Sequence, residues 1–405
     1  VAVLVDEAHN LVERGRSMYS GALSSGDLVA VRALAPPAIK RAIGKVLTAW
    51  RSLVESRTED FQIQAEPPPA VLELLRRLAT KIGEHFTEHP SQPAPELQRV
   101  YFDLLNLLGL AEDFGPHALC VMERQTGNPI RRQDTRHAKA KDRSTLSIRN
   151  VVPGRYLKAR IETAKSVAAF SATLQPVHFY RQLLGFGETT PWLDVPSPFS
   201  ADQLELQIVT GLSTRYQDRA RSAAPIATLI SDRFRSTPGN YLAFFSSYAY
   251  LDQVVAAMRT NHPEIPLRVQ GRGMSETDRT TFLGGFTHSS EAVGFAVLGG
   301  AFSEGVDLPG RQLIGVFVAT LGLPPFDALH EEMRKRMAML FGAEQADDFT
   351  YLYPGLQKVV QAAGRVIRSV DDRGAVVLID DRFGRSKVRG LLPGWWAPMD
   401  VIQKR

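Results

Sequence analysis

The sequence predicts an α/β fold in which parallel sheets are combined with a mostly helical segment. Two observations support this prediction. From about residue 200 onward, short apolar runs alternate with segments of helical periodicity, as in parallel sheets covered by helices on both faces. Between residues 21 and 115, apolar residues instead recur at spacings of three and four, which indicates amphipathic helices.

Composition places the chain among ordinary globular proteins. It has 405 residues, enough for two or three domains, with 44% hydrophobic and 22% charged residues. No apolar run reaches about 18 residues, so no transmembrane helix is expected, and no secretory signal pattern opens the chain. Because the chain starts inside a predicted strand without an initiator Met, we expect it to be the C-terminal part of a longer protein.

Cysteine content and charge narrow the function classes. The single cysteine, Cys120, excludes an internal disulfide and a thiolate-held zinc or iron–sulfur cluster within this chain. This usage is typical of a reducing cytoplasm. The net charge of +5 favours a polyanionic partner such as nucleic acid, although many unrelated proteins share it. We expect a cytoplasmic monomer without membrane contact, although the sequence does not determine the oligomeric state.

The first half of the chain opens on a strand and continues into helices. The unbroken apolar run 1–5 predicts a buried strand. Helical spacing over 39–53, 72–86 and 97–108 predicts three helices, which proline-rich segments separate. Residues 116–150 are less regular. Within them, 131–143 carries six Lys or Arg and two Asp, and this stretch, with His137, is either a solvated loop or a contact to a nucleic-acid strand. The segment 166–174 predicts a short buried strand followed by a turn.

The second half alternates strands with helices. Ligands of such parallel sheets bind at the carboxyl ends of the strands, so the loops there are the candidate functional segments. The predicted strands are 206–210, 241–247, 267–271, 293–299, 313–319 and 375–380, and the predicted helices are 223–234, 249–259, 276–286, 327–341 and 356–367.

Asp6-Glu7-Ala8-His9 directly follows the first strand. A carboxylate there can hold Mg²⁺ through its water shell, and the next one can orient an attacking water. We therefore predict these roles for Asp6 and Glu7, with His9 sensing the nucleotide state. The alternative is a helix N-terminus stabilised by acidic residues.

Two further motifs follow later strands. Ser171 and Thr173 belong to Ser-Ala-Thr just past the strand at 166, a motif that carries little information alone. Glu304, Gly305 and Asp307 follow the strand 293–299, where the glycine permits close approach to a phosphate or ribose. The alternative for the second motif is an acidic turn.

The last motif, Gln361-Ala-Ala-Gly364-Arg365-Val-Ile-Arg368, is the most informative. On a helix its polar residues lie on or near one face, and the two arginines offer planar donors to phosphate oxygens. The alternative is a solvated helix face, which the apolar Val366 and Ile367 disfavour.

The order and separation of these motifs resemble those of the XPD/DinG-like superfamily 2 DNA helicases. The likeness also includes "DEAHNL", "SATL", "SPF", "FFSSY", "FSEGVDLPG", "YLYP" and "RGAVVLIDDRF", and it runs almost from end to end. The segment 21–150 resembles the family only in position and helical character. The related group that acts on RNA typically has Gln-Arg-x-Gly-Arg-x-Gly-Arg in the last motif, and Ala-Ala and Val-Ile stand at the corresponding places here.

The resemblance implies two RecA-like motor domains with parallel sheets and a mostly helical, arch-like insertion. Residues 1–20 and 151–195 would complete the first motor domain, 21–150 would form the insertion, and 196–405 the second motor domain. The implied activity is ATP- and Mg²⁺-dependent movement 5′ to 3′ along single-stranded DNA. Many members carry a 4Fe–4S cluster, which the resemblance implies only for a longer form.

The resemblance also directs attention to DNA contacts. Ser246, Ser247 and Tyr248 of "FFSSY" follow a strand, where hydroxyl groups can bind phosphate and an aromatic ring can stack on a base. The alternative is that Tyr248 packs under the following helix.

The chain contains no G-x-x-x-x-G-K-[ST] phosphate loop. In this family the loop precedes the Asp-Glu-Ala-His motif, so we expect a truncated or split protein that is inactive by itself. Two alternatives stay open, a non-catalytic DNA- or partner-binding module and an RNA helicase.

Overall fold

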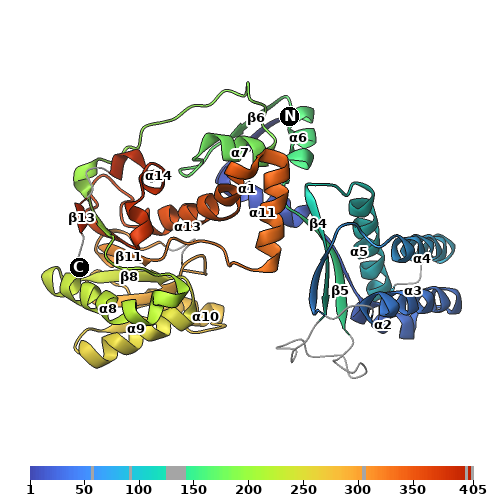
Figure 1. The fold of residues 1–405 in the computed structure, drawn as a ribbon, viewed down its shortest axis with the longest axis horizontal. Helices are drawn as coiled ribbons and strands as arrows, with labels where there is room; N and C mark the ends of the chain where they lie inside the picture. Colours follow the sequence, from blue (N-terminus) through green and yellow to red (C-terminus); the bar gives the residue numbers. More distant parts are fainter. Residues whose placement is uncertain (56–58, 91–93, 125–142, 303–306, 397–399, 403–405) are drawn as a thin grey trace. The chain divides into compact units, whose positions relative to one another are not determined.

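The computed structural model describes residues 1–55, 59–90, 94–124, 143–302, 307–396 and 400–402. They form two compact units (Figure 1). Unit 1 comprises Val1–Thr190 and Phe326–Ala346, and unit 2 comprises Pro191–Pro325 and Asp347–Arg405. Each unit is described by itself below.

Unit 2 is built on a seven-stranded sheet in which every pair of neighbouring strands is parallel. The strand order is β13-β7-β12-β11-β8-β10-β9. Six of these strands overlap the six predicted ones, so the parallel α/β fold is confirmed. The strands are β7 (Leu204–Val209), β8 (Asn240–Phe245), β9 (Leu267–Val269), β10 (Ala292–Val297), β11 (Gly315–Ala319), β12 (Gly374–Ile379) and β13 (Asp400–Ile402).

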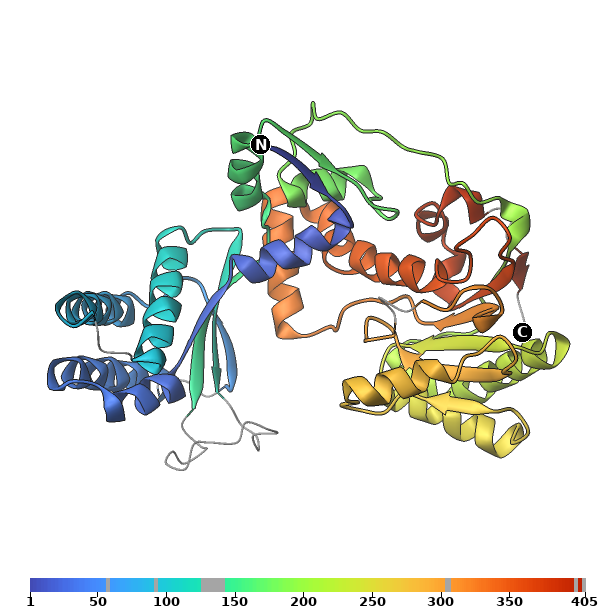
Figure 2. The same ribbon diagram turned by 180° about the vertical axis from the view of Figure 1, so that it is seen from behind.

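Helices cover both faces of this sheet, because its strands are apolar on both sides. Along β12, Val376 and Leu378 pack on one face with α10 (Glu276–Gly284) and α13 (Tyr353–Ala363). The alternating residues Val377 and Ile379 pack on the other face with α8 (Arg219–Ser236) and α9 (Tyr248–Asn261) (Figures 1 and 2). Shorter elements complete the unit: η3 (Ala201–Gln203), η4 (Tyr216–Asp218), η5 (Gly310–Gln312), the π-helical turn η6 (Asp348–Leu352), η7 (Asp381–Gly384), α14 (Ser386–Arg389) and η8 (Gly394–Trp396).

The end of α13 differs from the prediction. The helix stops at Ala363, so Arg365 and Arg368 lie in the turn and the irregular segment that follow and not on the helix. Both Val366 and Ile367 are buried in the core of unit 2, and leaving the helix at Gly364 allows these adjacent side chains to enter it together. The predicted one-face arrangement of the last motif is therefore wrong beyond residue 363.

The insertion in unit 1 contains a sheet that the sequence did not predict. Four antiparallel strands in the order β2-β5-β4-β3 pack with four helices around one core (Figure 1). Trp50 of α3 lies fully buried against this sheet and donates from Nε1 to Ser144 Oγ at 2.8 Å. The elements are β2 (Gly21–Ser24), α2 (Ser25–Leu34), α3 (Pro37–Glu55), β3 (Phe61–Gln64), α4 (Pro69–Glu88), α5 (Pro95–Glu112), β4 (Ala118–Arg124) and β5 (Ser144–Asn150).

The segment predicted as "less regular" therefore holds the two longest strands of unit 1, β4 and β5. The apolar run Ala118–Met122 is fully buried, and it was the available signal for a strand. Of the basic stretch 131–143, only Arg143 lies within the described residues, so neither interpretation of that stretch is tested.

The remainder of unit 1 contains a two-stranded parallel sheet. β1 (Ala2–Val5) pairs with β6 (Ser166–Ala169), with Val5 opposite Ala169. Both strands were predicted to be buried, but most of their residues are exposed. Among the described residues these strands pair only with each other, so their apolar faces stay open. The neighbouring elements are η1 (Ala8–Asn10), α1 (Leu11–Met18), α6 (Gly154–Thr163) and α7 (Val177–Leu184).

One segment packs away from its neighbours in sequence. Residues 326–346, which the sequence grouped with 196–405, belong to unit 1. They include α11 (Ala328–Phe341), whose Met337 is fully buried, and part of α12 (Ala343–Asp347). Helix α11 contacts strand β4 of unit 1.

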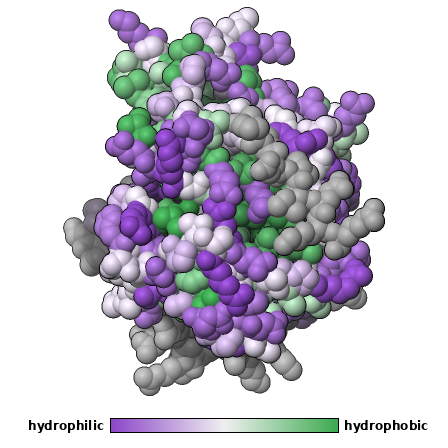
Figure 3. Space-filling model, turned by 90° about the vertical axis from the view of Figure 1, so that its left-hand side faces the viewer, coloured by the Kyte–Doolittle hydropathy of each residue, from purple (hydrophilic) through white to green (hydrophobic). Residues whose placement is uncertain are grey.

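Within the described residues, no helix is both long and apolar enough to cross a lipid bilayer. The face drawn in Figure 3 is largely hydrophilic, with apolar side chains gathered in small groups.

Candidate functional site

The Asp-Glu-Ala-His motif is joined to the Ser-Ala-Thr motif through the backbone. Phe170 N donates to Val5 O at 3.0 Å, and Ala8 N donates to Phe170 O at 3.1 Å. These bonds extend the β1–β6 pairing past the strand ends. Glu7 adopts φ 47° and ψ 44°, and it is the only non-glycine residue with positive φ among those the structure describes. Such a conformation costs about 1–3 kcal/mol and is often found at functional sites.

Ser171 connects the side chains of the two motifs. Its Oγ donates to Glu7 Oε2 at 3.1 Å and lies 2.6 Å from His9 Nδ1 and 3.2 Å from Thr173 N. A hydroxyl has one donor and two acceptor sites. Because Ser171 donates its proton to Glu7, the hydrogen bond between His9 and Ser171 must be donated by His9 Nδ1. Ser171 thereby uses its full hydrogen-bonding capacity within the two motifs.

Burial divides this group into a buried imidazole and an exposed carboxylate. The His9 side chain is 3% exposed and that of Glu7 61%, with His9 Nδ1 3.2 Å from Glu7 Oε2. The imidazole and the Ser171 hydroxyl restrain one carboxylate oxygen, while the carboxylate remains accessible. This is the arrangement that a carboxylate needs to orient a water molecule.

Asp6 offers one exposed carboxylate whose Oδ1 accepts from Glu7 N at 2.7 Å. No cluster of three or more His, Cys, Asp or Glu side chains suited to a metal ion occurs in the described part of the chain. Mg²⁺ is usually held by one or two carboxylates together with substrate phosphates and waters, so a single accessible carboxylate fits it. Cys120 is a buried free thiol in β4, and a thiol is not a ligand that Mg²⁺ prefers.

Unit 2 brings together one residue from each of its two motifs. Arg368 forms an ion pair with Asp307, and the side chains are 33% and 75% exposed. Asp372 Oδ2 accepts from the amides of Arg368 at 2.8 Å and Ser369 at 2.7 Å, which holds the segment after α13. The guanidinium is therefore positioned but stays accessible to solvent.

The other predicted site residues of these two motifs lie at the end of α13 or outside the described residues. Gln361 lies in the last turn of α13, Gly364 caps it, and the half-buried Arg365 follows in the turn. Glu304 and Gly305 lie outside the described residues.

The predicted DNA-contacting residues lie at the carboxyl end of β8. Ser247 caps α9 by accepting from Tyr250 N at 3.3 Å, and Ser246 Oγ is buried without a hydrogen-bond partner among the described residues. Tyr248 is half-buried, its Oη accepts from Gln270 Nε2 at 3.0 Å, and the Arg272 guanidinium covers its ring. This places Tyr248 between the two interpretations, since it packs in part and is exposed in part.

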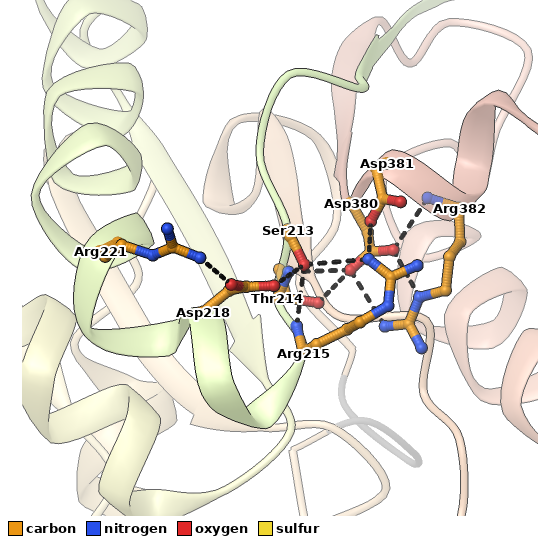
Figure 4. A network of polar contacts seen from close by, with 8 residues as sticks. All are labelled: Ser213, Thr214, Arg215, Asp218, Arg221, Asp380, Asp381 and Arg382. Carbon is orange, nitrogen blue, oxygen red and sulfur yellow. Dashed lines mark hydrogen bonds and ion pairs between the residues drawn. The ribbon is translucent and has the colours of Figure 1, made fainter.

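A polar network that the sequence did not predict occupies the adjacent edge of the sheet (Figure 4). It joins the loops after β7 and β12, whose carboxyl ends lie side by side because the strands are parallel. Arg215 pairs with Asp381 at 2.5 Å, Arg221 with Asp218, and Arg382 Nε with Asp380 at 2.6 Å. The available signal was a pair of acidic–basic segments, "STRYQDR" three residues after β7 and "DDRF" directly after β12.

Asp380 is the fully buried centre of this network. Its carboxylate accepts from Thr214 N at 3.0 Å, from the Thr214 hydroxyl and from Arg382 N at 2.9 Å. Burial opposes ionisation, but the Arg382 guanidinium and the Thr214 and backbone hydrogen bonds outweigh it and lower the pKa of Asp380.

We expect Asp380→Asn to lower the free energy of unfolding of unit 2 by about 3–5 kcal/mol, because it leaves the Arg382 guanidinium without its anion. Since the pKa of Asp380 is lower than the unfolded value of about 3.9, its contribution is fully present above that pH and is lost as the pH falls through the folded pKa. Urea unfolding followed at several pH values measures both effects.

Asp381→Asn is the matched control. Asp381 is 38% exposed, and within the network its ion-pair partner is Arg215. Its replacement should therefore lower the free energy of unfolding by less than about 1 kcal/mol. Equal losses for the two variants, or a loss for Asp380→Asn that persists unchanged in acid, would contradict the central role of Asp380.

Comparison with known proteins adds to this geometry. A helicase C-terminal domain matches residues 230–399. The chain is 28% identical over 266 residues to the general transcription and DNA repair factor IIH helicase subunit XPD of Arabidopsis thaliana, covering 59% of this chain and 33% of that protein. It is also 28% identical over 228 residues to the ATP-dependent helicase DinG of Mycobacterium tuberculosis, covering 55% and 33%.

A solved structure of an XPD helicase superposes with a TM-score of 0.60 at 19% identity, covering 99% of this chain and 68% of that one. At this identity the likeness shows the fold alone, and it confirms the predicted RecA-like α/β fold. The chain spans between about a third and about half the length of the curated relatives it matches.

Proposed function

Because this chain is the C-terminal region of an XPD/DinG-like superfamily 2 helicase, we propose that it forms part of an ATP-dependent DNA motor that moves 5′ to 3′ along single-stranded DNA. Residues 1–20 and 151–195 would belong to the first motor domain, 21–150 to an arch-like insertion and 196–405 to the second motor domain, except for residues 326–346, which belong to unit 1. The chain contains no phosphate loop, so hydrolysis would require a polypeptide segment that carries one.

The observation that best supports this proposal is the hydrogen-bonded group of Glu7, His9 and Ser171. It joins a water-orienting carboxylate to a second motif through a buried imidazole. A change at the nucleotide, felt at Glu7, would reach Ser171 and the chain that follows it through His9. Such a connection is what a motor needs to couple hydrolysis to movement.

The proposal assigns roles to the remaining residues. Asp6 would hold Mg²⁺ through its water shell, and ATP bound with Mg²⁺ supplies the phosphoryl group that is transferred to water. In unit 2, Arg365 and Arg368 would contact the phosphates, with Asp307 holding Arg368 in place beforehand. Gln361 and Gly364 would shape the segment that carries the arginines.

We expect the 405-residue chain to bind single-stranded DNA weakly and without strong sequence preference. Phosphate contacts release bound cations, so the affinity should fall steeply with rising salt. Titration of labelled DNA oligonucleotides of several sequences at low and moderate salt measures this directly.

Matched RNA oligonucleotides form the comparison arm of the titration. Equal or tighter binding of RNA would favour the RNA-helicase alternative. A folded chain that binds neither nucleic acid at low salt would point to a partner-binding module instead.

A further inference from the structure

Four arginines and three aspartates gather at the carboxyl edge of the sheet in unit 2. Three arginines are matched, since Arg215 pairs with Asp381, Arg221 with Asp218 and Arg382 with Asp380 (Figure 4). The fourth, Arg219, forms no ion pair with any carboxylate in the part of the chain that the structure describes. The cluster therefore retains one cation without an anion.

Arg219 is held in a defined position. Its guanidinium carbon lies 5.4 Å from the ring centroids of both Tyr216 and Tyr250. Its Nη1 lies 3.4 Å from Ser247 Oγ and its Nε 3.5 Å from Thr214 O, both long contacts that leave donor capacity unused. Burial lowers the pKa of Arg219, and Arg382 adds to this effect, so an incoming anion would relieve an existing electrostatic cost.

The two rings beside Arg219 differ in exposure. Tyr250 is fully buried and hydrogen-bonds Ser222 Oγ at 2.7 Å, so its ring is a fixed neighbour of the guanidinium. Tyr216 is 86% exposed, and it is the only large exposed aromatic residue among the described residues of unit 2. Most of its hydrophobic surface thus faces solvent beside a cation.

A nearby aromatic residue is less available. The Tyr248 ring already carries the Arg272 guanidinium 5.2 Å from its centroid, and the Tyr248 hydroxyl is engaged by Gln270. An unstacked base that reaches this edge therefore finds more free ring surface on Tyr216 than on Tyr248.

We propose that Tyr216 and Arg219 form a single-nucleotide subsite for single-stranded DNA, in which a base stacks on Tyr216 and the adjoining phosphate is bound by Arg219 and the Ser247 hydroxyl. This inference rests on the proposed DNA-binding function and adds two residues that no sequence motif indicated. A single strand fits better than a duplex, because only an unpaired base can turn its face toward an exposed ring.

The test titrates the 405-residue chain with a labelled DNA oligonucleotide of about 16 nucleotides. Tyr216→Ala should weaken binding by about 5- to 100-fold, as expected for loss of one stacked base, whereas Tyr216→Phe keeps the ring and should stay within about twofold of the wild type. On an oligonucleotide of abasic sites, Tyr216→Ala should have no effect, because no base remains to stack.

The phosphate contact is tested by salt dependence. Arg219→Ala should reduce the slope of log affinity against log salt by about 0.7, the value for one phosphate of a single strand, and Arg219→Lys should keep that slope. Arg221→Ala is the matched control: the same charge is removed from the same helix, but Arg221 is 82% exposed and already paired with Asp218. Its slope should not change.

Separate results would overturn the two levels of the proposal. No DNA binding by the folded wild-type chain would overturn the proposed DNA-binding function and this subsite with it. Wild-type binding with an unaffected Tyr216→Ala variant, an equal loss on abasic DNA, or equal slopes for Arg219→Ala and Arg221→Ala would overturn the subsite alone. If Arg219→Ala fails to fold, Arg219→Gln, which also removes the charge but keeps a longer side chain, takes its place in the salt titration, and the Tyr216 pair tests the stacked base independently.

Discussion

In a form of the protein that contains a phosphate loop, replacing Glu7 by Gln is expected to lower the rate of ATP hydrolysis by about 10²–10⁴-fold. The amide keeps the shape of the carboxylate and can still accept the Ser171 hydrogen bond, but it cannot orient and deprotonate water. Nucleotide binding should therefore survive. The measurement is DNA-stimulated phosphate release together with nucleotide binding.

Glu13→Gln provides the matched control, since Glu13 lies in the adjacent helix α1, is 73% exposed and pairs only locally with Arg16. It should hydrolyse ATP like the wild type. The 405-residue chain without a phosphate loop is the negative control, and turnover from it near about 1 per second would contradict the expected need for that loop. Unchanged turnover in Glu7→Gln would remove Glu7 from the reaction.

Replacing Arg368 by Ala is the second large expected effect. Negative charge spreads over the oxygens of the transferred phosphoryl group, and an arginine that contacts them contributes about 10³–10⁵-fold in rate. Arg368 is paired with Asp307 in this structure and is 33% exposed, so it can exchange the carboxylate for a phosphate. Turnover in the loop-containing form should fall by orders of magnitude, while affinity for DNA stays nearly intact.

Arg373→Ala is the control for this substitution. Arg373 is 63% exposed and pairs with Asp202 at 3.0 Å, so the same charge is lost from a similar ion pair in the same unit. Its turnover should match the wild type. If Arg368→Ala instead loses DNA affinity and rate by the same factor, Arg368 contacts DNA and not the phosphates of ATP.

The local pattern of apolar residues was sufficient to predict the strands and helices of unit 2. Runs such as Tyr241–Phe245 and Val293–Ala296 are continuously apolar, and only a strand covered on both faces buries every residue of such a run. The intervening helical periodicity predicted the helices that supply this cover. The same reasoning placed the Asp-Glu-Ala-His and Ser-Ala-Thr motifs at strand ends, where the β1–β6 pairing brings them together.

Pairing between distant segments was not visible in any local pattern. β4 and β5 are separated by 19 residues of sequence, from Arg124 to Ser144, and the sheet they form determines the core of the insertion. The end of α13 likewise depends on the burial of Val366 and Ile367, and α11 belongs to unit 1, where it contacts β4, although it follows strand β11 of unit 2 in sequence.

The sequence by itself therefore determined the alternating strands and helices of unit 2, the motifs at their ends and the family resemblance, because these follow from residue periodicity and order along the chain. Tertiary structure alone decided which charges meet. Arg221 and Arg382 each pair with a carboxylate of their own segment, but Arg215 meets Asp381 only because parallel pairing of β7 with β12 brings the two following loops side by side, and Arg219 has no carboxylate partner among the described residues. That difference is a property of distances in space, and the tyrosine and arginine of the proposed subsite depend on it.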